Sequence, residues 1–187
     1  MKPMERNPKI RQADLPSLKI IRYPDPRLRE VSTPVEEIDN HVRRLADRMF
    51  ALMLAAKGVG LAAPQVGVTV RLFVTSPTFQ EQDRRVYVNP ELISLDGQQE
   101  DEEGCLSFPG ITSKIKRGHV ATIRATNLDG QTFQETGEGL TARVFQHEMD
   151  HINGRLLIDR MGSVARLSHR RALADLEEQF AAAKPAR

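Results

Sequence analysis

The chain has 187 residues, of which 40% are apolar and 28% charged, and its formal net charge is +2. This composition predicts one globular domain with a core of its own, and it excludes disordered and fibrous proteins. So small a net charge does not support nucleic-acid binding, and a chain with no Trp, 2 Tyr and 7 Phe has few rings on which single-stranded bases could stack.

The sequence carries no feature of a membrane or secreted protein. Its longest apolar run, residues 49–56, is much shorter than the ~20 residues that cross a bilayer. No apolar stretch follows the basic residues at the N-terminus, so a secretory signal is not expected. The single cysteine, Cys105, excludes an intramolecular disulfide. We therefore expect a cytoplasmic protein with neither DNA nor a membrane as a partner.

The first third of the chain is predicted to contain one helix. Residues 1–16 are expected to form a loosely ordered N-terminal extension. A helix is predicted over 37–57, because apolar side chains recur there at a spacing of three to four residues. Gly58 and Gly60 are expected to end this helix, since glycine readily adopts a left-handed backbone.

The rest of the chain is predicted to combine short strands with two further helices. Strands are predicted at 70–75, 86–88, 120–125 and 131–134, with a hairpin turn at 128–130, and helices at 139–153 and 163–182. The acidic stretch 91–103 is expected to be a solvated loop. No βαβ unit repeats, so we expect an α+β fold in which antiparallel sheets pack around the helix at 139–153, with one helix earlier in the chain and one at its C-terminal end.

The central helix carries a candidate metal site. His147, Glu148 and His151 form the pattern H-E-x-x-H. Histidines four residues apart lie on one face of a helix, with Cβ atoms ~5–6 Å apart, so both rings can reach one ion. Such an ion lowers the pKa of a bound water to ~7, and a carboxylate beside it can move the proton. The alternative is a pair of core histidines with a partly exposed glutamate.

The sequence offers several candidates for a third ligand. Metalloproteases of the long-motif type would have a histidine at position 157, which is Leu157 here. Glu177 and Glu178 lie on the last predicted helix, where a charged surface face is the favoured explanation for them. Cys105 has acidic neighbours, which do not suit a nucleophilic thiolate, whereas a metal deprotonates a coordinating thiol outright. An inert, buried cysteine remains the alternative.

Three segments together resemble one enzyme family. Residues 58–65 (GVGLAAPQ), 103–107 (EGCLS) and 146–151 (QHEMDH) are similar to the three motifs of peptide deformylases, G-x-G-x-A-A-x-Q, E-G-C-L-S and Q-H-E-x-D-H. The motifs occur in the same order as in the family, and the resemblance runs from about residue 18 to about residue 160.

The resemblance implies a hydrolase that removes the formyl group from N-formylmethionine at the start of nascent proteins and releases formate. Cys105, His147 and His151 would bind one ferrous ion, for which zinc, nickel or cobalt can substitute. Glu148 would act as general base and then general acid while metal-bound water or hydroxide attacks the formyl carbon.

Further roles follow from the same resemblance. Gln65 and the backbone N–H of Leu106 would donate to the oxyanion, and both would also contact substrate, as would Val59 and Gly60. Thr112 stands where the best-known members have a basic residue.

The resemblance also implies a division of the chain. Residues 17–162 would form the catalytic domain, and residues 163–187 a C-terminal helix and tail belonging to the same domain. In some relatives such a helix docks on the ribosome near the tunnel exit, although a helix packed on its own domain explains the pattern equally well. Two other functions remain open: a zinc endopeptidase of the H-E-x-x-H type, and a non-enzymatic, metal-stabilised module associated with the ribosome.

Overall fold

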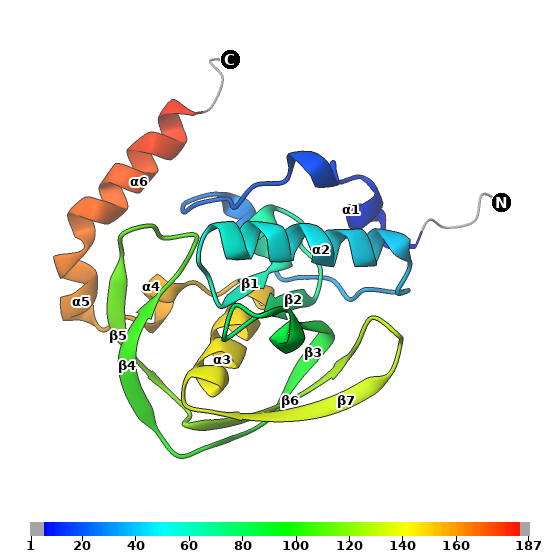
Figure 1. Ribbon diagram of the computed structural model, residues 1–187. Helices are drawn as coiled ribbons and strands as arrows, with labels where there is room; N and C mark the ends of the chain where they lie inside the picture. The colour runs from blue at the N-terminus through cyan, green and yellow to red at the C-terminus, as the bar shows by residue number, and fades with distance from the viewer. Residues whose placement is uncertain (1–5, 184–187) are drawn as a thin grey trace.

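The helix α3 (Leu140–Ile152) occupies the centre of the computed structural model, which describes residues 6–183 (Figure 1). Strands surround it as two antiparallel sheets, and β1 and β2 lie between it and the long helix α2 (Asn40–Ala55). The strands are β1 (Gly60–Ala62), β2 (Leu72–Thr75), β3 (Arg85–Asp96), β4 (Gln99–Gly104), β5 (Thr112–Arg117), β6 (Val120–Thr126) and β7 (Thr132–Glu138). The remaining helices are α1 (Pro8–Arg11), α4 (Leu157–Arg160), α5 (Ser163–Ser168) and α6 (Arg170–Ala182). The predicted α+β class with antiparallel sheets is confirmed.

The larger sheet has the strand order β1-β2-β3-β6-β7, and β4 pairs with β5 in a separate two-stranded sheet. The strand β1 is therefore an edge strand, since among residues 6–183 it pairs with β2 alone. The buried face of α3 packs against the larger sheet through Phe145, Met149 and Ile152, with Phe73 and Tyr87 opposite. This packing fixes the position of α3, and with it the position of every side chain that the helix carries.

The N-terminal segment is more ordered than the sequence suggested. Ile10 on α1 is fully buried in the same core cluster as Val42 and Leu45 of α2. The side chain of Asn7 accepts a hydrogen bond from the Glu36 backbone at 2.8 Å and donates one to the Glu37 carbonyl at 2.6 Å. The expectation of a loose extension is therefore wrong for residues 6–16, while residues 1–5 lie outside the described part of the chain.

The end of α2 also differs from its prediction. The left-handed residue is Lys57, with φ 56°, and neither Gly58 nor Gly60 has a positive φ. The N–H groups of Lys57 and Gly58 donate to the carbonyls of Leu54 and Met53 at 3.0 and 2.9 Å, which is the hydrogen-bond pattern of a Schellman motif. A lysine thus occupies the position at which most such motifs have glycine.

The acidic stretch is not a loop, because it forms the end of β3 and most of β4. Two carboxylates of β4 stand opposite lysines of β5 in the register of the hairpin, Glu100 opposite Lys116 and Glu102 opposite Lys114. Opposite charges in such positions stabilise a strand pair. The predicted strand at 86–88 accordingly extends to Asp96, and β1, β4 and β5 were not among the predicted strands.

The last predicted helix is two helices. His169, with φ −92° and ψ 2°, separates α5 from α6, and α6 projects from the rest of the fold in Figure 1. Leu173 and Leu176 bury one side of α6 against the core cluster that contains Leu28 and Phe108. The expected hairpin turn at 128–130 is present, with the Asn127 side chain accepting from the N–H groups of Asp129 and Gln131. Within residues 6–183, no helix is both long and apolar enough to span a membrane.

Candidate metal centre and active site

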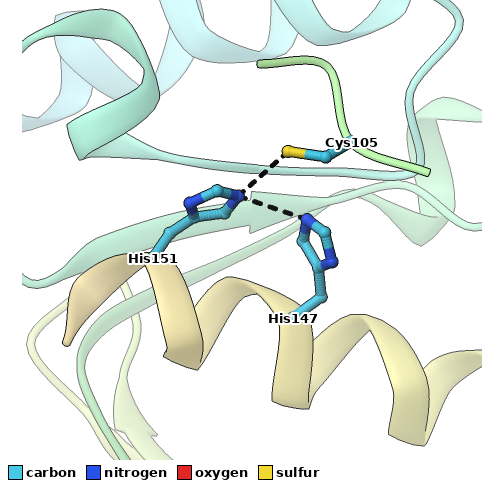
Figure 2. Close-up of side chains that lie close together, drawn as sticks. All are labelled: Cys105, His147 and His151. Carbon is cyan, nitrogen blue, oxygen red and sulfur yellow. Dashed lines mark hydrogen bonds between the residues drawn. The ribbon is translucent and has the colours of Figure 1, made fainter. Parts of the chain in front are cut away.

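The two histidines of α3 point their rings at a common point. His147 and His151 are one helical turn apart, and their Nε2 atoms lie 3.2 Å from each other (Figure 2). The Sγ atom of Cys105, in the loop after β4, lies 3.2 Å from the Nε2 atom of His151. All three donor atoms lie within 4.8 Å of one another, and among the residues that the structure describes this is the one such cluster of three or more histidine, cysteine or acidic side chains.

The geometry and chemistry of these donors fit a transition-metal ion. Metal–nitrogen bonds of about 2.0–2.1 Å in a tetrahedral site place two ligand nitrogens about 3.3 Å apart, close to the separation of the two histidine nitrogens. Two imidazoles and one thiolate suit zinc or ferrous iron far better than magnesium or calcium, which prefer oxygen. Three protein ligands also match a catalytic site, which keeps a position open for water or substrate.

Glu103 sets the orientation of the first histidine. The Nδ1 atom of His147 lies 2.7 Å from the Glu103 carboxylate, whose oxygens can only accept. His147 therefore donates its Nδ1–H to Glu103, and the lone pair of Nε2 faces Cys105 and His151. A carboxylate behind a ligating histidine holds the ring and makes it a better ligand. The Nδ1 atom of His151, in contrast, is buried without a hydrogen-bond partner in residues 6–183.

Glu103 belongs to a buried network of ion pairs. Its carboxylate accepts from Arg117 at 2.6 and 3.1 Å and from Arg143 at 2.8 Å. Arg117 also donates to Asp150 at 2.6 Å, and Arg160 forms a bidentate pair with the same aspartate. Glu103, Arg117, Arg143 and Asp150 are each less than a tenth exposed. A continuous chain of charged side chains thus joins Arg160 to His147.

The charges of this network shift the pKa values of the site. Burial alone would raise the pKa of Glu103, but hydrogen bonds from His147 and Arg117, and their charges, hold it well below the usual value. Burial opposes protonation of His147, yet the Cys105 and Glu103 groups raise its pKa well above the usual value. Burial and the neighbouring His147 charge lower the pKa of His151.

The sequence patterns did not reveal the role of Glu103 or the burial of its partners. Glu103 was counted in a solvated acidic loop, although it is 5% exposed. Asp150 is likewise buried, and it forms an ion pair with Arg117. The available signal was the motifs themselves, because Glu103 begins the segment EGCLS and Asp150 lies within QHEMDH.

Glu148 lies beside the three donors and is almost completely buried. It is 3% exposed, and its Oε2 atom has no hydrogen-bond partner among residues 6–183. Burial raises the pKa of Glu148 to about 7, against the opposing effect of the His147 charge. Gly60 allows this position, because a Cβ at residue 60 would meet Oε1 of Glu148 at 2.5 Å. A carboxyl group that titrates near neutral pH suits transfer of a proton in either direction.

Gln65 and Leu106 reach the same place from two other segments. Gln65 lies on the short 3-10 helix Ala63–Val66, where its Oε1 accepts from the Ala62 N–H at 2.8 Å. This contact directs its Nε2 toward Cys105 Sγ at 3.5 Å and Ser107 Oγ at 3.3 Å. The Leu106 N–H donates to no acceptor in the described part of the chain, so it is available to a bound molecule.

A cleft of about 560 Å³ connects these groups to solvent. All the site residues predicted from the sequence except the buried His151 line this cleft: Val59, Gly60, Gln65, Cys105, Leu106, His147 and Glu148. Thr112 lines it as well. Segments from β1, β4, β5, α3 and the end of α2 therefore meet around one opening, beside the three converging atoms that could hold a metal ion.

Comparison with known proteins shows which family has this arrangement. The sequence model of polypeptide deformylases matches residues 17–167, which include all three motifs. The chain belongs to the polypeptide deformylase family. A peptide deformylase of Acidobacterium capsulatum is 47% identical over 149 residues, which are 79% of this chain and 88% of that protein. Another from Pseudomonas aeruginosa is 41% identical over 165 residues, 88% of this chain and 98% of that protein.

Solved structures of deformylases share the fold. A crystal structure of a peptide deformylase from Legionella pneumophila superimposes with a TM-score of 0.82 and 43% identity, covering 90% of this chain and 99% of that one. A Plasmodium falciparum peptide deformylase gives a TM-score of 0.87 at 35% identity, covering 90% and 100%. The chain is thus an enzyme with the deformylase fold, and the family predicted from the three motifs is confirmed.

Proposed function

We propose that this deformylase is a metal-dependent hydrolase that removes the formyl group from N-formylmethionine at the start of newly made proteins and releases formate. The convergence of Cys105 Sγ and the two Nε2 atoms of His147 and His151, next to Glu148 in an open cleft, carries this proposal. Ferrous iron is the proposed ion, with zinc, nickel or cobalt as substitutes, because the cluster of one sulfur and two imidazoles accepts each of them. When bound, the ion supplies Lewis acidity, which lowers the pKa of a water and polarises a carbonyl oxygen.

Glu148 is the proposed proton carrier. As a carboxylate it takes a proton from the water that attacks the formyl carbon, and the new C–O bond forms as the proton moves. It then gives that proton to the leaving amine as the C–N bond breaks. Its pKa of about 7 suits both steps.

Gln65 and Leu106 are the proposed oxyanion donors. The Nε2 group of Gln65 and the N–H of Leu106 face the cleft beside Cys105, where negative charge develops on the formyl oxygen during attack. Donors held in place before the reaction are worth ~3–4 kcal/mol each in barrier terms. The hydrogen bond from Ala62 to Gln65 holds one of them in place.

The free edge of β1 is the proposed support for the substrate backbone. The strand β1 pairs on one side with β2, and Val59 and Gly60 line the cleft on the other. An extended peptide can add to such an edge as a further strand, with its own backbone groups paired. The formyl group would then lie at the metal centre, and the following residues would leave through the mouth of the cleft.

The two other functions fit the site less well. A four-ligand structural site requires a fourth donor, and no further histidine, cysteine or acidic ligand atom joins Cys105, His147 and His151 among residues 6–183. The endopeptidase function would require a third ligand other than cysteine. Because the substrate is a nascent chain, we propose that the enzyme acts in the cytoplasm. Docking of α5 and α6 on the ribosome is part of this proposal, and lost co-sedimentation on deleting residues 163–187 would support it.

One experiment separates these functions. The protein is loaded with iron without oxygen and incubated with formyl-Met-Ala-Ser, with its acetyl analogue and with an end-blocked peptide, and formate and cleavage products are measured. We expect formate from the formyl peptide alone. Glu148→Ala is expected to retain metal and lose almost all activity, whereas Glu178→Gln, at an exposed acid of α6, serves as the control that retains activity. Cleavage of the blocked peptide, or full activity in Glu148→Ala, would exclude the proposal.

A further inference from the structure

Two unpaired cations stand at the mouth of the active-site cleft. Arg22, in the segment before η2 (Pro26–Arg29), and Lys57, at the end of α2, both line the cleft and are both exposed. Neither forms an ion pair with an acid in residues 6–183. We refer to Arg22 and Lys57 as the rim cations.

No opposite charge balances the rim cations within the cleft. The one carboxylate in its lining is Glu148, which is 3% exposed and lies beside the metal ligands. The other exposed lining residues, Thr112 among them, carry no charge. None of the acids of β4 lines the cleft, and Glu100 and Glu102 stand opposite lysines of β5. The mouth of the cleft is therefore positive, from side chains that come from two distant parts of the sequence.

The conformation of Lys57 strengthens this observation. Its φ of 56° is a left-handed conformation that costs a side chain with a Cβ about 1 kcal/mol or more, and glycine usually occupies this place in a Schellman motif. The chain thus has a lysine where local stability favours glycine. Side chains retained against local stability are typical of functional positions.

The path of the substrate brings its downstream residues to the rim cations. The formyl group and methionine must reach the inner end of the cleft, where Cys105, Gln65 and Glu148 lie. The residues after methionine then lie toward solvent, where Arg22 and Lys57 are the charged groups of the lining. We propose that the rim cations select nascent chains with acidic residues directly after the initiator methionine and disfavour those with basic residues there. This inference rests on the proposed deformylase activity.

The test compares three formylated peptides whose C-termini are amides: formyl-Met-Glu-Glu, formyl-Met-Gln-Gln and formyl-Met-Lys-Lys. We expect kcat/KM to be highest for the acidic peptide and about tenfold higher than for the basic one at about 0.01 M salt, mostly through KM. At about 1 M salt, where the Debye length is about 3 Å, we expect the ratio to approach one.

Variants assign the effect to the rim cations. Arg22→Gln combined with Lys57→Gln should bring the ratio of acidic to basic peptide close to one at low salt, and Lys57→Glu should lower it further. Arg44→Gln removes one exposed charge of α2 outside the cleft and should keep the wild-type ratio. Circular dichroism checks the fold of each variant, and the salt dependence of the wild-type enzyme tests the proposal even if a variant does not fold.

The outcomes separate this inference from the function on which it rests. Formate from none of the three peptides would reject the deformylase activity itself. Equal rates for all three peptides, independent of salt, would overturn charge selection by the rim cations and leave the activity intact. A ratio unchanged in the double variant would overturn it as well.

Discussion

Gly60→Ala tests whether the position of Glu148 depends on a missing side chain. An added Cβ at residue 60 would meet Glu148 Oε1 at 2.5 Å and Val144 Cγ1 at 2.9 Å. Cβ atoms essentially never come within 3.0 Å of another heavy atom, so the carboxylate must move by about 0.5 Å or more. Gly60 is in β1, and the paired backbone of β1 with β2 resists movement in the other direction.

The size of the effect follows from the displaced carboxylate. A misplacement of about 1 Å costs a catalytic group about a hundredfold in rate, so a shift of half that distance or more should lower kcat between about tenfold and about a hundredfold. Overpacking of this kind costs about 1–3 kcal/mol of stability, which should leave the variant folded. The loss should appear in kcat, because a proton carrier acts in the chemical step.

The assay is formate release from formyl-Met-Ala-Ser, with metal content and thermal unfolding measured on the same samples. Gly162→Ala is the control, since a Cβ there meets nothing within 4 Å. We expect the control to keep wild-type kcat. A Gly60→Ala enzyme that folds, holds metal and keeps kcat within about threefold of wild type would refute the argument that Gly60 makes room for Glu148.

Four further predictions follow. Glu103→Gln leaves Arg117 and Arg143 underpaired in a buried place, so the free energy of unfolding should fall by about 3 kcal/mol in urea titration, with metal affinity reduced about 10–100-fold in competition assays. The pKa of Glu103 in the folded state lies below its unfolded value of about 4.3, so its ion pairs stabilise the fold above that pH and are lost as the pH falls through the folded pKa. The melting temperature should therefore decrease below about pH 4, and the decrease should be less steep in Glu103→Gln. Lys57→Gly should raise the free energy of unfolding by about 0.5–1 kcal/mol, and a lower urea midpoint would contradict the assignment of strain to that residue. Removal of the metal by a chelator should lower the melting temperature reversibly. For an ion present at a hundred times its dissociation constant, the loss corresponds to about 2.7 kcal/mol of unfolding free energy. A chelator that leaves the melting temperature unchanged would contradict metal binding by the native fold.

Local patterns in the sequence were sufficient for α3, the helix that carries His147, Glu148 and His151. The apolar spacing over 139–153 predicted α3 to within a residue at each end, because any helix with one buried face has apolar residues every three to four positions. The same helical pitch predicts that His147 and His151 lie on one face, as the structure shows. The three motifs predicted the family, and the comparisons confirmed it.

The partners of these side chains came from the packing of segments far apart in the chain. In the sequence, Glu103 is one residue of an acidic run. In the fold, the pairing of β4 with β5 directs its side chain inward, against Arg117 and His147. Lys57 is a rim cation because the turn after α2 and the segment that contains Arg22 line the same cleft in the fold. The register of β4 against β5 and the arrangement of charged side chains around the cleft depend on contacts across long sequence separations. A pattern along one segment contains no information about such contacts. The three candidate metal-binding residues were therefore named from the sequence and its family resemblance, and the fold brings them together, whereas their orientation and the charge around them depend on the assembled fold.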